Sequence, residues 1–284
     1  MGFDESFDRK SGIGASESYA AENECIELWQ TKLGLKEEFT GNEATELGQE
    51  TEAINLKIGC RKAGIKLKSI NEETRRHPQH PGIFATADAF GTAEINGREE
   101  EVIIEAKMVG VNRARHWGDP RDGWDAIPEY VQTQVIQQMA VYDVWYAYVS
   151  LLLGTKVVVY GPLIRDLERE RAQIKKTLNF IDKIKNRQEP PIDDKPAWKK
   201  YLSDKFKEMR RITKKGNAET NRKILRRCEL SELLSDLQKE RDTIDNYLRA
   251  EIGDMESVET PMGLATWRKN RLGNRILKVK RKKE

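Results

Sequence analysis

The chain has 284 residues, of which 38% are hydrophobic and 34% are charged, and its formal net charge is +3. This length is enough for one large domain, or for one domain with an appendage. No segment reaches the roughly 20 consecutive apolar residues of a membrane helix, and the N-terminal MGFDESFDRK lacks the apolar stretch of a signal peptide, so we expect a cytoplasmic protein.

The cysteines and histidines do not form a recognisable metal or disulfide pattern. Cys25, Cys60 and Cys228 are too widely spaced for a disulfide framework or a zinc site, and the three histidines are scattered. We therefore expect any bound metal to be held by oxygen ligands.

Two helices are predicted near the N-terminus. Ser16 can cap a helix that runs to about Lys32, with Gly34 as its stop. Asn42 can cap a second helix that ends at Gly64.

The pattern then changes to short runs that are typical of strands. These runs cover residues 65–70, 82–90 and 101–108, and the last two are joined by a turn-like stretch, 91–97. A helix is predicted from Pro128 to about Tyr142, followed by buried strands at 145–153 and 156–160. This order predicts an α/β (α+β) fold with a mixed central sheet flanked by helices.

A long amphipathic helix at about 163–187 ends at Glu189-Pro190-Pro191, which predicts a nuclease-sized domain at 1–190 and a charged helical extension at 191–284. Residues 195–227 carry a charge of +10, whereas residues 229–259 carry −7. Two helices of opposite charge packed as a hairpin, or a DNA-binding stripe, would explain this contrast. A β-hairpin at 263–267 and 275–279 and a solvated basic tail, 280–283, are expected to close the chain.

A candidate catalytic strand lies in the run from Val102 to Lys107. Strand periodicity places Ile103, Glu105 and Lys107 on one face. Because an unpaired buried charge is costly and the flanking residues are apolar, Glu105 and Lys107 are expected to have partners.

Asp88 is the natural partner of Glu105, because a hairpin would bring the two carboxylates together. Adjacent carboxylates repel each other unless a cation lies between them, and hard oxygen ligands suit Mg²⁺ or Mn²⁺. Lys107 could then orient the attacking water or help to deprotonate it. An acid followed by Glu-x-Lys is the signature of the PD-(D/E)xK nuclease superfamily, which has a restriction-endonuclease-like core.

Further segments make the chain resemble the YqaJ-type viral recombinase and lambda exonuclease family. Arg9 and Gly12-Ile13-Gly14-Ala15-Ser16-Glu17 are similar to the family's N-terminal motif, and the resemblance implies that Arg9 and Ser16 hold a DNA 5′-phosphate. The segment from Leu47 to Glu52 resembles a helix whose glutamate helps to hold metal; the match falls on Glu52, and Glu50 lies on the other side of the helix.

The helix at 129–139 resembles the family's Tyr…Gln-Val-x-x-Gln-Met segment. Tyr130, Gln134 and Gln138 lie on one face, and the resemblance implies that Gln134 lies nearest the catalytic lysine, with Tyr130 and Gln138 as further candidates. Two features depart from the family. Ala87-Asp88-Ala89 replaces the Pro-Asp-Gly of many members, with a longer loop expected after it, and Tyr130 precedes Gln134 by four residues where some members have a spacing of three.

The resemblance implies a 5′-to-3′ exonuclease on double-stranded DNA ends that produces 3′ overhangs for phage-type recombination. Asp88, Glu105, the carbonyl of Ala106 and Glu52 would hold two Mg²⁺ or Mn²⁺ ions, and Lys107 and Gln134 would position the water. A trimeric ring, a single-strand annealing partner and a site of action in a bacterial host's cytoplasm are also implied. The alternatives are a structure-specific or nicking endonuclease with the same centre, and a catalytically silent DNA-binding or assembly protein.

Overall fold

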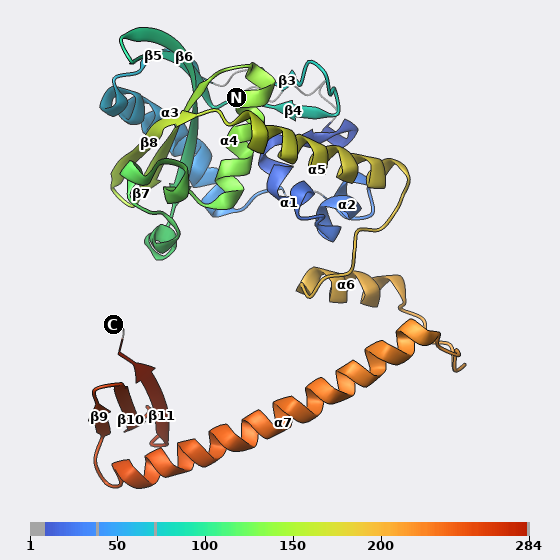
Figure 1. Ribbon diagram of the computed structural model, residues 1–284. Coiled ribbons are helices and arrows are strands. Elements are labelled where there is room, and N and C mark those ends of the chain that lie inside the picture. Colours follow the sequence, from blue (N-terminus) through green and yellow to red (C-terminus); the bar gives the residue numbers. More distant parts are fainter. Residues whose placement is uncertain (1–8, 38–39, 71–72, 283–284) are drawn as a thin grey trace. The chain divides into compact units, whose positions relative to one another are not determined.

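The computed structural model describes residues 9–37, 40–70 and 73–282 (Figure 1). The chain divides into two compact units between Lys207 and Glu208. No helix in the described ranges combines the length and the apolar character that crossing a membrane requires.

A five-stranded mixed sheet forms the centre of the first unit, which confirms the predicted fold class. Its strand order is β2-β5-β6-β7-β8. β6 and β7 are parallel, whereas the three other neighbouring pairs are antiparallel. The strands are β2 (Lys66–Ile70), β5 (Ala89–Ile95), β6 (Arg98–Val109), β7 (Tyr146–Leu153) and β8 (Lys156–Ile164).

The predicted strand at 82–90 is in fact two strands that belong to different sheets. β4 (Ile83–Ala85) lies between β1 (Ile13–Gly14) and β3 (Arg75–Arg76) in a small second sheet, whereas β5 starts only at Ala89. The backbone of the break is held from helix α4 (Glu129–Tyr142), where Gln138 Nε2 donates to Thr86 O and Tyr142 Oη accepts from Ala87 N.

The turn after this break is also shorter than predicted. β5 continues to Ile95, and the hairpin turns at Asn96 and Gly97, which both have positive φ (53° and 74°). Two consecutive residues at positive φ are typical of a tight two-residue hairpin turn. The turn-like stretch predicted at 91–97 is therefore wrong in its extent, because only Asn96 and Gly97 form the turn.

The predicted helix at 16–32 is also interrupted. The segment forms short turns η1 (Arg9–Ser11) and η2 (Ala15–Glu17), then α1 (Ser18–Glu22) and α2 (Ile26–Lys32). Ser16 lies inside η2 and is not a helix cap; the Glu17 carboxylate instead accepts from Gly14 N at 2.8 Å and pairs with Lys32 at 2.7 Å. The helix breaks where Glu24 adopts a φ of 49°.

Helices cover both faces of the central sheet. α3 (Glu43–Ala63) begins as predicted, with Asn42 Oδ1 accepting from Thr45 N, and ends at Gly64 with a φ of 68°. Its Leu56 and Cys60 join one apolar cluster, and α4 and α5 (Leu167–Lys185) contribute to another. Two further turns, η3 (Val111–His116) and η4 (Pro120–Ala126), follow β6.

The first unit extends beyond the boundary that the sequence predicted at residue 190. Helix α6 (Pro196–Lys205) buries Trp198 and Tyr201 in the main core, and the Tyr201 ring meets the Trp29 ring edge-on at 6.2 Å. These aromatic contacts explain why the compact unit ends at Lys207.

The second unit consists of one long helix and a small sheet. α7 (Ala218–Ile252) precedes the antiparallel strands β9 (Ser257–Thr260), β10 (Gly263–Lys269) and β11 (Arg275–Arg281). The predicted terminal hairpin is present, but the hairpin of two oppositely charged helices is not, because α7 continues without a break from the basic residues into the acidic ones (Figure 1). Lys283, in the predicted basic tail, lies outside the described residues.

Candidate active site

The break between β4 and β5 brings Asp88 beside strand β6. Ala89 pairs with Ile104 in the β5–β6 ladder, so Asp88 lies one step beyond it, next to Glu105. The carboxylate of Asp88 accepts a hydrogen bond from the backbone N–H of Ala106 at 2.7 Å. The Ala87-Asp88-Ala89 segment therefore positions the acid without a glycine beside it.

Glu105 and Lys107 meet on the face of β6 that the periodicity predicted. Glu105 is only 2% exposed. The ammonium group of Lys107 donates to Glu105 Oε1 at 2.6 Å and to Gln134 Oε1 at 2.8 Å, and Gln134 Nε2 donates to Glu105 Oε1 at 2.6 Å. The three side chains thus form a closed triangle of hydrogen bonds between β6 and α4.

Gln138 completes the environment of Glu105. Its Nε2 donates to Glu105 Oε2 at 2.5 Å and to the carbonyl of Thr86 at 2.9 Å. Gln138 therefore connects the buried carboxylate to the backbone just before Asp88. Its own Oε1 is buried, with no hydrogen-bond partner among the described residues.

Glu52 approaches the same centre from α3. It is partly buried, whereas Glu50 is exposed, as the helical geometry predicted. Burial raises the pKa of Glu52, and the negative charge of Glu105 raises it further, while Lys107 opposes both effects.

Asn55 is a positioning residue that the sequence analysis missed. Its amide donates to the carbonyl of Lys107 at 3.2 Å and to that of Ser150 at 2.9 Å, so it fixes α3 to the backbones of β6 and β7. The sequence offers one signal for this role, because Asn55 is a polar residue about one helical turn after Glu52 and directly before the apolar Leu56, which is buried.

The centre carries more negative than positive charge. Burial raises the pKa of Asp88 well above its usual range, and the neighbouring Glu105 and Glu52 carboxylates add to this rise against the effect of Lys107. Burial alone would lower the pKa of Lys107, but the charges of Glu105 and Asp88 more than offset it, so that this pKa is raised. Lys107 is therefore held in its ammonium form.

The donor set fits a hard divalent cation. Asp88, Glu105 and Glu52 offer carboxylate oxygens only. A divalent ion would balance the negative charges of Glu105 and Glu52, which add to the effect of burial in raising the pKa of Asp88. Among the described residues, however, no three His, Cys, Asp or Glu side chains already form a group that could hold an ion. The part of the site that is already assembled is thus Asp88, which accepts from the backbone N–H of Ala106, and the adjacent Glu105.

The remaining predicted residues lie on α4 and on the N-terminal segment. Tyr130 lies on the first turn of α4, and its hydroxyl contributes to raising the pKa of Lys107. Arg9 and Ser16 are exposed on the N-terminal segment and are not among the side chains that hydrogen-bond Glu105. That segment is attached to the site's helix, because Gln137 Nε2 donates to Ile13 O at 3.0 Å and to Phe84 O at 2.9 Å.

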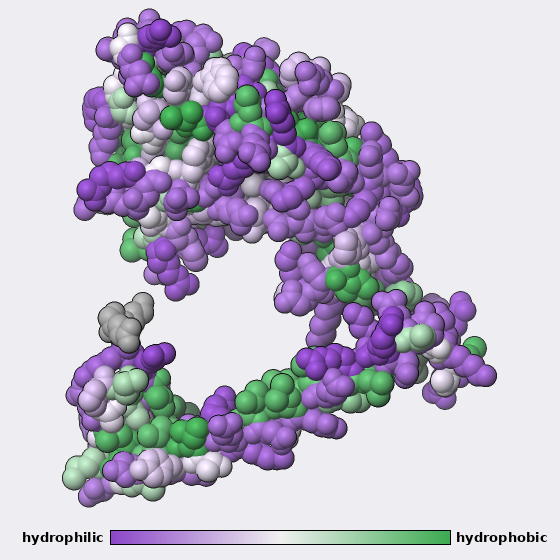
Figure 2. Space-filling model, in the orientation of Figure 1, coloured by the Kyte–Doolittle hydropathy of each residue, from purple (hydrophilic) through white to green (hydrophobic). Residues whose placement is uncertain are grey.

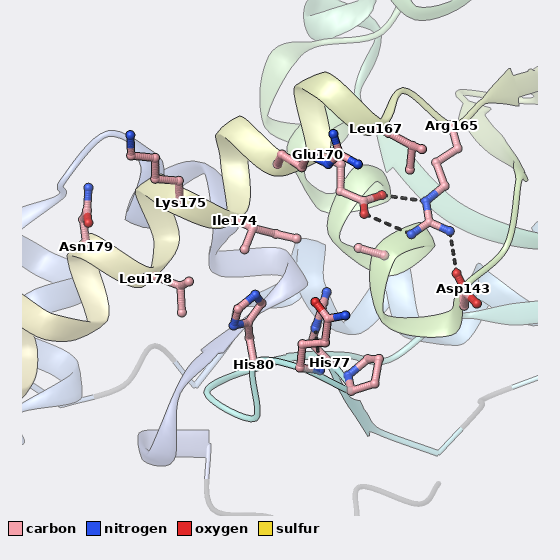
Figure 3. A pocket seen from close by; sticks show the side chains of 14 residues that line it. His77, His80, Asp143, Arg165, Leu167, Glu170, Ile174, Lys175, Leu178 and Asn179 are labelled. Carbon is pink, nitrogen blue, oxygen red and sulfur yellow. Dashed lines mark hydrogen bonds and ion pairs between the residues drawn. The ribbon is translucent and has the colours of Figure 1, made fainter.

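A separate cavity of about 570 Å³ is lined by other residues than those of the carboxylate centre (Figure 3). It is bounded by α5, the end of α4 and the loop that carries His77 and His80, and none of the predicted site residues lines it. On one side Arg165 pairs with Glu170 at 2.6 Å and with Asp143 at 2.7 Å. The carboxylate centre and this cavity are therefore distinct features.

Comparison with known proteins gives one family match. Residues 7–144 match the family described as the YqaJ-like viral recombinase domain. No curated protein matches the chain.

Several solved structures are similar to the chain at low sequence identity. An alkaline exonuclease (LHK-Exo) from Laribacter hongkongensis is 16% identical, with a TM-score of 0.48 over 69% of this chain and 94% of that chain. A phage related exonuclease from Haemophilus somnus 129PT is 15% identical, with a TM-score of 0.42 over 62% of this chain and 96% of that chain.

Proposed function

We propose that the chain is a DNA exonuclease that digests double-stranded DNA ends from 5′ to 3′ with a divalent metal and leaves 3′ single-stranded overhangs. The match of residues 7–144 to the YqaJ-like viral recombinase domain supports this proposal. The observation that carries this proposal is the convergence of Asp88, Glu105, Lys107 and Gln134 at one edge of the β5–β6 hairpin. Asp88, Glu105 and Lys107 are the residue types that the PD-(D/E)xK signature requires.

Metal would be held by Asp88, Glu105, the carbonyl of Ala106 and Glu52, as two Mg²⁺ or Mn²⁺ ions. When bound, such ions supply charge stabilisation at the phosphate and make water more acidic. Burial raises the pKa of Asp88, and the carboxylates of Glu105 and Glu52 raise it further; the effect of these neighbouring negative charges supports this assignment.

The protein's own groups orient the reactants. Lys107 is an ammonium donor that Glu105 and Gln134 hold in place, so it can hold a water or a phosphate oxygen in a fixed direction. Gln138 fixes the second oxygen of Glu105. Because these groups are positioned before DNA arrives, little reorganisation is needed during the reaction.

The N-terminal segment would recognise the DNA end. Arg9 and Ser16 are both exposed and available to an anion, and Gln137 ties their segment to the helix that carries Gln134. Arg9 and Ser16 holding the terminal phosphate would make 5′-phosphorylated ends the preferred substrate.

The wider setting follows from the family resemblance. We propose a ring-shaped trimer of first units, a single-strand annealing protein as partner, and a phage or prophage role in recombination in a bacterial cytoplasm. The first unit would supply resected DNA, and the annealing protein would use the exposed single strand.

Digestion of three duplex substrates tests the proposal. We expect Mg²⁺-dependent digestion of linear 5′-phosphorylated DNA, slower digestion of 5′-hydroxyl DNA, and none of covalently closed circles. Lys107→Ala and Asp88→Ala should abolish digestion while the far-ultraviolet circular dichroism spectrum is retained. Cleavage of circles would indicate an endonuclease, and full activity in both variants would refute the assignment of the centre.

A further inference from the structure

An apolar stripe runs along α7 in the second unit (Figure 2). Leu234 and Leu237 are 64% and 52% exposed, and most of the stripe is open to solvent within the part of the chain that the structure describes. Leu230, Leu234, Leu237, Ile244 and Leu248 lie on one face of the helix, with Leu233 and Tyr247 beside them. Their steps are of three and four residues, except for the step of seven from Leu237 to Ile244, where Arg241 occupies the intermediate position.

This spacing is typical of a helix that packs against another helix. Alternating steps of three and four residues define the a and d positions of a heptad repeat. An isolated helix gains most of its stability from packing its apolar face, and α7 has 35 residues. Such length together with an exposed stripe indicates a coiled-coil partner.

The charges of α7 determine which direction of pairing is favourable. Its first part is basic, with Arg222, Lys223, Arg226 and Arg227 against Glu219, whereas residues 229–251 hold seven acidic and three basic residues. A parallel pair of such helices would place like charges together. An antiparallel pair would place the basic end of each helix against the acidic part of the other.

We propose that α7 pairs with α7 of a second copy of this chain as an antiparallel two-helix coiled coil. If the two-fold axis passes near Lys239, Leu230 lies opposite Leu248 of the partner subunit, and Leu234 lies opposite Ile244 of the partner subunit. Each a position then meets a d position, and the apolar stripes of both copies are covered.

The charged residues at the ends of the stripe fit the same register. Arg227, one heptad before Leu234, lies opposite Glu251 of the partner subunit. Arg241 occupies an a position opposite Leu237 of the partner subunit; its aliphatic stem can cover the leucine while its guanidinium reaches water. A polar residue at one a position also favours a single register, at some cost in stability.

The oligomeric mass of the full chain tests the pairing. A two-fold interface makes the number of chains in the assembly even, so two trimeric rings joined through α7 would contain six chains. Leu234→Asp with Ile244→Asp should halve the mass measured by light scattering at micromolar concentration. Ser235→Asp with Thr243→Asp is the matched control, because it adds the same two charges on the opposite face of α7 and should leave the mass unchanged.

Cross-linking tests the direction. In a Cys228→Ser background, which removes the exposed native thiol, Leu234→Cys protein mixed with Ile244→Cys protein should form covalent dimers with a short bismaleimide. Leu234→Cys protein alone should not. Dimers from Leu234→Cys alone would indicate parallel helices and overturn the proposal.

Two other outcomes would also overturn it. An odd number of chains in the wild-type assembly would exclude a two-fold α7 pair. Equal masses for the wild type and the Leu234→Asp, Ile244→Asp variant would show that the stripe is covered by something other than a second copy, such as the first unit of the same chain.

Discussion

Replacing Gln138 with leucine is a direct test of how the site holds its buried carboxylate. Leucine is close in size to glutamine but cannot donate to Glu105 Oε2 or to the carbonyl of Thr86. The change therefore leaves one oxygen of a 2% exposed carboxylate without its amide donor. It also releases the backbone just before Asp88.

The expected magnitudes follow from these contacts. A hydrogen bond to a charged group contributes about 1.5–3 kcal/mol and a neutral one about 1 kcal/mol. Removal of the unpartnered Gln138 Oε1 offsets part of this loss, because an unsatisfied buried polar atom costs about 1–3 kcal/mol. We therefore expect a net loss of about 1–2 kcal/mol in the free energy of unfolding.

The effect on catalysis should be larger than the effect on stability. Glu105 also orients Lys107, so a shift in its carboxylate moves the ammonium group as well. A misplacement of about 1 Å can reduce the rate by about 100-fold. We expect Gln138→Leu to lower kcat on linear duplex by roughly this factor, with little change in KM.

Gln137→Leu is the matched control, because Gln137 is the adjacent buried glutamine of the same helix. It donates to two neutral carbonyls, those of Ile13 and Phe84. Its loss should cost about 2 kcal/mol of stability and raise KM through the N-terminal segment, while kcat changes little. Urea unfolding and steady-state digestion of both variants separate the two effects. Unchanged kcat in Gln138→Leu, or an equal fall in Gln137→Leu, would refute the reasoning.

Three further predictions concern packing, charge and the DNA end. Gly59→Ala places a Cβ 2.1 Å from Ser150 Oγ and should lower the free energy of unfolding by about 1–3 kcal/mol. Gly48 is on the same helix, but a Cβ there would meet no atom within 4 Å, so Gly48→Ala should raise the free energy of unfolding by about 0.5–1 kcal/mol. Thermal melts compare the two variants. Because the pKa of Asp88 is raised on folding, the metal-free protein loses stability as the pH rises above the pKa of an aspartate in the unfolded chain. Asp88→Asn should therefore stabilise the metal-free protein at pH 7 more than at pH 4. Urea unfolding at both pH values tests this, and a variant that is less stable than the wild type at pH 7 would contradict it. Arg9→Ala should reduce the preference for 5′-phosphorylated over 5′-hydroxyl ends, and an unchanged rate ratio would remove Arg9 from end recognition.

The parts of the fold that local sequence determines were predictable. The side chains on each face of β6 follow from strand alternation alone, which placed Glu105 and Lys107 together. The limits of α3 follow from the side chain of Asn42 and the positive φ of Gly64. In these segments the signal and the structure both depend on residues a few positions apart.

The break between β4 and β5 could not be predicted in this way. Residues 82–90 read locally as one strand, but Tyr142 and Gln138 bond the backbone of Ala87 and Thr86 from more than 50 positions away. Such distant contacts override local strand propensity. The same break places Asp88 against Ala106, so the position of this acid depends on tertiary structure and not on local sequence.

α7 illustrates the opposite error, in which charge suggested a break that the backbone does not require. The change of sign between Arg227 and Glu229 favoured two helices, yet no glycine or proline lies between Ala218 and Ile252. A helix ends where its backbone is interrupted or capped, and a change of charge does neither. The contrast of charge along one unbroken helix has a different consequence, since it makes antiparallel association more favourable than parallel association.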